Sequence, residues 1–194
     1  MFTGIISHLG RFQGFESGKQ QLCISAQDLS ADLQVGDSLA VNGVCLSLIR
    51  KEKDDLYFNL SAETRIKTTL SSLGRGDLLN LELPLTLASP LGGHLVTGHI
   101  DGIGKVNRVT AQAGGKRIVV GYPAGLRPFL VPKGSVALDG VSLTVAALSS
   151  RVLEVEVIPV TLSRSTLGQW RAGRRINIEC DIIGKYVYNW TVKS

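Results

Sequence analysis

The chain has 194 residues, of which 44% are hydrophobic and 19% charged, and its formal net charge is +5. This composition is typical of a globular protein and excludes a disordered or fibrous chain. No nucleic-acid readout motif accompanies the densest basic cluster, at residues 171–175, and no apolar segment approaches the roughly 20 residues that span a bilayer. We therefore expect neither nucleic acid nor membrane as a partner.

Short segments that alternate apolar and polar residues dominate the first half of the chain and indicate antiparallel strands. They are Ile5 to Gly14, Gln21 to Ala26, Ser38 to Leu48, Leu56 to Leu60 and Leu78 to Leu83. Short helical turns are expected at residues 28–33 and 68–70, and Asn42-Gly43 is typical of a hairpin turn. Several short strands in a small domain avoid exposed edges by closing into a barrel, so we predict a barrel.

After a linker at residues 85–90 the sequence repeats itself. Phe2–Ile6 returns as Val96–Ile100, Leu39–Ser47 as Val136–Thr144, and Gly76–Glu82 as Gly173–Glu179. A unit of roughly 90 residues therefore occurs twice, which predicts two copies of one domain, since solenoid repeats are shorter. We place these domains at residues 1–90 and 91–181. Strands are expected again, at residues 103–109, 117–121 and 152–158, with turns at 113–116, 123–130 and 165–167.

The tail, residues 182–194, has no counterpart in the first repeat. Its apolar residues at 182, 183, 186, 187 and 190 form one helical stripe. A helix this short is marginal in water unless the stripe is buried. It either caps its own barrel or meets copies of itself in a closed homo-oligomer, and the small size of the domains favours the second arrangement.

Three cysteines, Cys23, Cys45 and Cys180, form no closely spaced pair. Their odd number and wide spacing argue against a disulfide framework and a zinc site and favour a reducing compartment. The first residues also lack the charged lead and apolar run of a secretion signal. We expect a cytoplasmic protein without a metal.

Differences between the repeats indicate where their chemistry diverges. The differing pairs are Ile5 and His99, Cys45 and Ser142, Ser47 and Thr144, and Asn42 and Asp139. A histidine near a hydroxyl can move protons at neutral pH, so His99 and Ser142 are candidates for acid–base catalysis. Structural roles compete with this interpretation: His99 as a polar residue held by the fold, Cys45 as a small buried apolar residue, and Asp181 as a helix N-cap. Glycine pairs such as Gly92-Gly93 lack the context of a phosphate-binding loop and favour turns.

Four motifs in order, Met1–Ile5, Asn42–Leu46, Gly92–His99 and Asp139–Thr144, closely resemble those of the riboflavin synthase alpha-chain family. The resemblance implies an all-β fold of two similar six-stranded antiparallel Greek-key barrels plus a C-terminal helix, through which three chains form a homotrimer. It implies dismutation of two 6,7-dimethyl-8-ribityllumazine molecules to riboflavin and 5-amino-6-ribitylamino-uracil without a cofactor. It also makes lumazine synthase an expected partner.

The resemblance further implies the site residues. It assigns His99, Ser142 and Thr144 to a site on the second barrel, with Lys133 and Asp139 nearby, and Cys45 and Ser47 to a site on the first. Asp181, Phe2 and Thr3 also match functional positions of the family. The remaining substrate contacts, made largely through the backbone, are Gly4, Ile5, Ile6, Leu46, Asn59, Leu60, Ser61, Ala62, Glu63, Thr64, Gly98, Ile100, Leu143, Glu156, Val157, Ile158, Pro159, Val160 and Thr161.

Two other functions remain open at this point. One is a non-catalytic lumazine- or flavin-binding protein, similar to the antenna lumazine proteins of luminous bacteria. The other is a structural module that binds no lumazine. Because His99, Cys45, Ser142 and Thr144 are all present, we favour the enzyme, since function depends on the site and not on the barrel.

Overall fold

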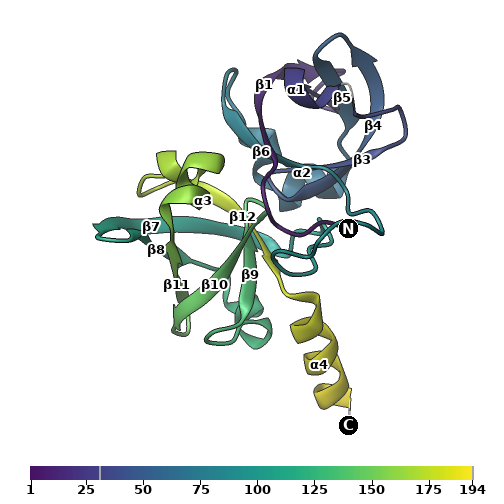
Figure 1. Ribbon diagram of the computed structural model, residues 1–194. Coiled ribbons are helices and arrows are strands. Elements are labelled where there is room, and N and C mark those ends of the chain that lie inside the picture. Colours follow the sequence, from purple (N-terminus) through teal and green to yellow (C-terminus); the bar gives the residue numbers. More distant parts are fainter. Residues whose placement is uncertain (31, 194) are drawn as a thin grey trace.

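The computed structural model describes residues 1–30 and 32–193. Within these residues the chain forms two closed antiparallel barrels of six strands each and one helix that leaves the second barrel (Figure 1). The predicted fold class is therefore confirmed. In Figure 1 the N-terminus lies between the two barrels.

The first barrel has the strand order β1-β2-β5-β4-β3-β6. Two connections, from β2 to β3 and from β5 to β6, pass over neighbouring strands, which gives the barrel its Greek-key topology. The first connection carries α1 (Gln27–Ser30), and the second carries α2 (Ala62–Lys67) and the 3-10 helix η1 (Thr69–Ser72). The strands are β1 (His8–Glu16), β2 (Gln21–Ser25), β3 (Ser38–Val41), β4 (Val44–Glu52), β5 (Asp55–Asn59) and β6 (Leu78–Glu82).

The second barrel repeats this topology, with the order β10-β11-β8-β7-β12-β9. Its long connections carry η2 (Ala124–Phe129) in one case and α3 (Pro159–Arg164) with η3 (Thr166–Gln169) in the other. The strands are β7 (Gly102–Gln112), β8 (Gly115–Gly121), β9 (Ser135–Leu138), β10 (Val141–Leu148), β11 (Val152–Val157) and β12 (Arg175–Cys180). Equivalent strands pair in both barrels, so the sequence repeat is also a structural repeat.

Each barrel has its own hydrophobic core, as the alternation of side chains along the strands requires. Phe58 and Leu22 are completely buried in the first core, and Trp170 and Ile178 in the second. Burying a side chain of this size contributes about 1.5–3 kcal/mol. The cores therefore stabilise the two barrels separately.

The two predicted hairpin turns meet where the barrels touch. Asn42 and Gly43 both have positive φ, 46° and 78°, as do Asp139 and Gly140, 44° and 80°. This is the geometry that Asn-Gly and Asp-Gly favour in tight hairpins. The backbones of Gly43 and Gly140 pack so closely that a Cβ on Gly43 would lie 2.6 Å from the nitrogen of Gly140.

Buried amide side chains connect the barrels across these turns. Nδ2 of Asn80, on β6, donates to the carbonyl of Asp139 at 2.9 Å, and Nδ2 of Asn177, on β12, donates to the carbonyl of Asn42 at 2.9 Å. All four residues are buried. Because buried polar groups are costly without partners, this reciprocal network fixes how the barrels pack.

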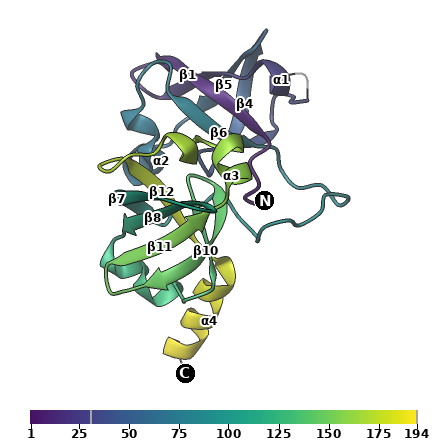
Figure 2. The same cartoon turned by 60° about the vertical axis from the view of Figure 1, so that its left-hand side comes forward.

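Two segments lie outside the barrels. The linker after β6 stands away from both barrels as a long loop (Figure 2), and Leu87 in it is fully exposed. The final helix, α4 (Ile182–Lys193), points away from the first barrel in both views. Within the described residues, no helix is long and apolar enough to cross a membrane.

Some element boundaries differ from the sequence prediction. The segment Ser38 to Leu48 is divided by its hairpin turn into β3 and β4, and β1 begins at His8 instead of Ile5. The helices α2 and α3 were not predicted, because six residues are too few to show a helical period. Ala31, in one predicted turn, and Ser194, at the end of the predicted helix, lie outside the described residues.

Candidate active site

The segments that precede the two barrels pair with each other. The nitrogen of Phe2 donates to the carbonyl of Val96 at 2.7 Å, and the nitrogen of Val96 donates back at 3.1 Å. Both side chains are buried. We call residues 2–6 and 96–100 the crossing segments, because each continues from this pair towards the barrel of the other repeat.

A buried glutamate holds each crossing segment. Glu82, at the end of β6, accepts hydrogen bonds from the nitrogen and hydroxyl of Thr3, both at 2.6 Å, and from the nitrogen of Gly4 at 2.9 Å. Burial raises the pKa of Glu82, while the three donors oppose that shift. Glu179, at the end of β12, holds the second segment in the same way, through Thr97 N (2.6 Å), Thr97 Oγ1 (2.7 Å) and Gly98 N (2.9 Å).

Each crossing segment then contacts the opposite barrel. The carbonyl of Gly98 accepts a hydrogen bond from the nitrogen of Cys45 at 2.9 Å, and the carbonyl of Gly4 accepts one from the nitrogen of Ser142 at 2.8 Å. A Cβ added to Gly98 would lie 2.4 Å from the Cβ of Cys45, and a Cβ added to Gly4 would lie 2.6 Å from the Cβ of Ser142. Only glycine permits this approach. Each candidate site is therefore built from both repeats.

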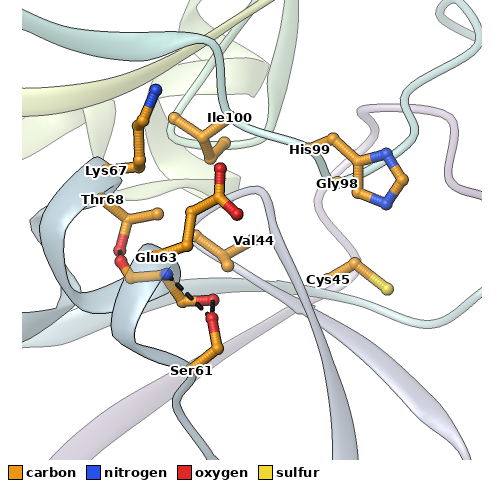
Figure 3. A pocket seen from close by; sticks show the side chains of 10 residues that line it. Val44, Cys45, Ser61, Glu63, Lys67, Thr68, Gly98, His99 and Ile100 are labelled. Atoms are coloured by element: carbon orange, nitrogen blue, oxygen red, sulfur yellow. Dashed lines mark hydrogen bonds between the residues drawn. The ribbon is translucent and has the colours of Figure 1, made fainter.

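The first site is a cavity of about 250 Å³, which we call the N-terminal pocket. It lies between the start of β4, the helix α2 and the second crossing segment (Figure 3). Its lining residues are Val44, Cys45, Ser61, Glu63, Thr64, Lys67, Thr68, Gly98, His99 and Ile100. Seven of them were predicted as site residues and are brought together here: Cys45, Ser61, Glu63, Thr64, Gly98, His99 and Ile100.

His99 shares this pocket with Cys45 and not with Ser142. The family resemblance assigns His99 and Ser142 to one site on the second barrel, whereas within this chain His99 lies beside Cys45. The reason is the crossing, which carries His99 onto the opposite barrel. In Figure 3 the imidazole of His99 and the thiol of Cys45 extend to the same side of the pocket, so the N-terminal pocket combines a thiol with an imidazole.

The equivalent site around Ser142, the C-terminal site, contains a different histidine. The Nδ1 atom of His94 lies 2.7 Å from the Ser142 hydroxyl oxygen. Burial lowers the pKa of His94, and the nearby Asp181 carboxylate opposes this shift. The Nε2 atom of His94 is buried without a hydrogen-bond partner among the described residues. The sequence analysis missed this role, because His94 precedes the repeated segment and has no equivalent in the first repeat.

The rims of the two sites differ in polarity. Three rim residues of the N-terminal pocket, His99, Ser61 and Glu63, are polar. Their equivalents at the C-terminal site are apolar and exposed: Ile5 (49%), Ile158 (56%) and Val160 (48%). The C-terminal site therefore presents an apolar rim to solvent.

Two residues predicted to contact substrate are enclosed. Phe2 has no exposed surface and packs with Val96 between the repeats. Asp139 is 1% exposed and its Oδ1 accepts a hydrogen bond from the nitrogen of Asn177 at 2.8 Å. Burial raises the pKa of Asp139 to about 6, although Arg174 at 3.5 Å acts in the opposite direction. Both residues therefore belong to the packing between the barrels and not to a pocket wall.

Four other predicted residues do not line the N-terminal pocket and lie on β4, on β10, before β9 and before α4. Ser47 and Thr144 are exposed on β4 and β10, and the nitrogen of Lys133 donates to the carbonyl of Val145, beside Thr144, at 2.8 Å. Asp181 precedes α4, and its carboxylate accepts a hydrogen bond from the nitrogen of Ile183 at 3.0 Å, as an N-cap does. The buried side chains of Leu46, Leu60, Leu143 and Val157 point into the barrel cores, which leaves only their backbones for a ligand.

Comparisons with known proteins agree with this architecture. The lumazine binding domain family matches residues 3–84 and 97–181, which is one domain per barrel. The riboflavin synthase of Bacillus subtilis is 34% identical over 100% of this chain and 91% of that protein, and the riboflavin synthase of Mycobacterium bovis is 37% identical over 96% of each. The crystal structure of LumP complexed with riboflavin superposes with a TM-score of 0.84 at 23% identity, over 93% of this chain and 99% of that one. With both repeats matched and its relatives aligned over almost their whole length, this chain belongs to the riboflavin synthase family.

Proposed function

We propose that this chain converts two molecules of 6,7-dimethyl-8-ribityllumazine into riboflavin and 5-amino-6-ribitylamino-uracil, by transfer of a four-carbon unit. The observation that carries the proposal is the pair of equivalent sites, around Cys45 and Ser142, each completed by the opposite repeat. A reaction between two copies of one compound needs two similar sites. Holding both substrates in a fixed orientation supplies a large part of the rate enhancement.

The reaction requires the loss of a proton from the 7-methyl group of one lumazine. The carbanion that results is delocalised into the electron-poor ring, so a positioned proton acceptor is sufficient. The contact between His94 and Ser142 supports such a role: a neutral imidazole that accepts the Ser142 proton turns the hydroxyl into a base or nucleophile. The pKa of His94, lowered by burial, favours that neutral form. Cys45 and His99 are the corresponding groups in the N-terminal pocket.

We further propose that the N-terminal pocket of one protomer faces the C-terminal site of the next. The contrast between the rims supports this arrangement, because the exposed Ile5, Ile158 and Val160 lose contact with water when a second rim covers them. Two ring-shaped substrates would then lie face to face between the protomers.

A homotrimer joined through α4 would bring these sites together. The exposed apolar stripe of α4 supports this proposal, with exposed fractions of 61% for Ile183, 73% for Tyr186 and 57% for Val187. Removing residues 185–194 should shift the protein from trimer to monomer in a sedimentation velocity experiment. A truncated chain that sediments unchanged would contradict it.

Location and further partners are also proposals. The three cysteines are all free, which supports a reducing, cytoplasmic compartment. An association with lumazine synthase stays a prediction of the family resemblance.

The test of the main proposal is turnover. Purified protein incubated with the lumazine should form riboflavin and 5-amino-6-ribitylamino-uracil in equal amounts, with two lumazines consumed for each riboflavin. Ser142→Ala, matched with Ser149→Ala in an exposed turn of the same barrel, tests whether product formation depends on the site.

The alternative function is a non-catalytic lumazine-binding protein. The similarity to LumP, in crystal structures with 6,7-dimethyl-8-(1'-D-ribityl) lumazine and with riboflavin, is the observation that favours it. In that case the protein would bind the lumazine, and the absorption spectrum of the mixture would show no riboflavin after long incubation.

A further inference from the structure

A wide groove of about 850 Å³ lies between the first barrel and α3 of the second. Ile5, Leu9 and Leu78, none of which is buried, contribute apolar surface to it, and Arg11 and Arg164 contribute basic side chains. Within residues 1–30 and 32–193 neither arginine takes part in an ion pair. Asp28 is the one carboxylate in the lining. Apolar surface beside two unpaired cations suits an amphiphilic anion.

The groove adjoins the C-terminal site. The groove is lined by Ile5, Ile6 and Arg164. Their equivalents in the other repeat are His99, Ile100 and Lys67, and all three line the N-terminal pocket. A ring placed against Ser142 would therefore have the groove beside it. The polar chain of such a ligand can extend towards Arg164.

The two sites differ in how they would receive an anionic group. In the N-terminal pocket the carboxylate of Glu63 shares the cavity with Lys67 (Figure 3). At the C-terminal site the residue equivalent to Glu63 is the apolar Val160, while the cation is kept as Arg164. Like charges repel, so a phosphate near Lys67 is opposed by the carboxylate of Glu63. In the groove the one carboxylate, Asp28 on α1, is outnumbered by Arg11 and Arg164, so the charge of the lining favours a phosphate.

We propose that the groove binds the phosphate of a phosphorylated ring–polyol compound whose ring lies in the C-terminal site. The inference rests on the proposed function, because a phosphorylated form of the product, riboflavin 5′-phosphate, has this chemistry. Bound there, it excludes one of the two substrates. The groove is then a regulatory site through which a phosphorylated product limits turnover.

The test compares riboflavin 5′-phosphate with riboflavin as ligands of the full-length protein, by quenching of flavin fluorescence. At low salt the phosphate should tighten binding by about tenfold, and this preference should disappear in about 1 M salt, where the Debye length is only about 3 Å. Arg164→Gln should abolish the preference, and Arg11→Gln should weaken it. Lys67→Gln, at the equivalent position of the first repeat, is the matched control and should retain the preference.

Equal affinities for the two flavins in the unmodified protein would overturn the inference, and so would a preference that survives Arg164→Gln. If Lys67→Gln lost the preference while Arg164→Gln kept it, the phosphate would lie in the N-terminal pocket, and this result would also overturn the inference. Riboflavin formation from the lumazine is measured on the same preparations. A protein that forms riboflavin but ignores the phosphate refutes this inference alone, whereas one that binds flavins but forms no riboflavin refutes the proposed function.

Discussion

The Nδ1 atom of His94 lies 2.7 Å from the hydroxyl oxygen of Ser142, 48 positions further along the chain. The contact depends on the segment before the second crossing, where Gly93 packs so tightly that an added Cβ would lie 2.9 Å from the Ser142 hydroxyl oxygen. His94 is buried, with Nε2 unpaired among the described residues. Of the two histidines at the sites, His94 is therefore the one with a fixed hydroxyl partner.

His94→Gln should lower kcat by about 10²–10⁴-fold, the usual contribution of a positioned proton-transfer group, and should change ligand affinity little. The glutamine retains a hydrogen-bonding side chain of similar length, which limits the structural disturbance. Steady-state kinetics with the lumazine and titration with riboflavin separate the two effects. A variant that loses affinity while kcat is preserved would show that His94 only shapes the site.

The pH dependence of kcat should reflect the low pKa of His94. Burial moves this pKa below the ordinary value of 6.5, so the neutral base persists as the pH falls through 6.5 and the acid limb of the profile begins lower. In Asp181→Asn the limb should move further down, because the carboxylate that raises the pKa of His94 is removed. An upward shift of the limb would contradict this assignment.

Gly98→Ala should destabilise the fold and close the N-terminal pocket. The new Cβ would lie 2.4 Å from the Cβ of Cys45, at a φ of 84° that L-residues avoid. Together these effects cost about 2–5 kcal/mol of unfolding free energy. The control is Gly36→Ala, which has a φ of 99° but no atom within 4 Å of the new Cβ, and so carries the backbone cost without the clash. Equal losses in urea denaturation would show that Gly98 is not tightly packed.

Asp139→Asn should stabilise the protein at neutral pH. Burial raises the pKa of Asp139 from 3.8 to about 6 in the folded state. Between pH 3.8 and about pH 6 the folded protein therefore keeps a proton on Asp139 that the unfolded chain releases, and the free energy of unfolding falls as the pH rises through this range. An asparagine removes that loss and can accept the same hydrogen bond, as Asn42 does from Asn80 in the first repeat. We expect a gain of about 1–3 kcal/mol at pH 7 and almost none at pH 4. Denaturation at both pH values checks the difference.

The internal repeat was sufficient to predict two copies of one domain, and the alternation of residues and the Asn42-Gly43 and Asp139-Gly140 turns predicted strands and hairpins, because these patterns report on local structure. The six strands and the Greek-key order of each barrel came from the family resemblance. It could not predict which barrel a crossing segment contacts. The family resemblance assigns His99 and Ser142 to one site, yet the crossing places His99 beside Cys45 within the chain. Contacts between distant segments leave no periodic signal.

Burial was equally inaccessible to the sequence analysis. Asp139 differs from its equivalent Asn42 by charge, a difference typical of a functional site, but both residues lie in the packing between the barrels. His94 was not predicted because it has no equivalent in the first repeat, and comparison of the repeats finds only residues that have one. A chemical role could be assigned to it only when its distance to Ser142 was known.

The claim that each chain holds two ligands, in sites built from both repeats, is tested most directly by calorimetric titration with a ribityllumazine analogue that lacks the 7-methyl group and cannot react. The account predicts two analogues bound per chain in the unmodified protein and one in Gly98→Ala, whose C-terminal site is intact. A single analogue per chain in the unmodified protein, or two in Gly98→Ala, would contradict it.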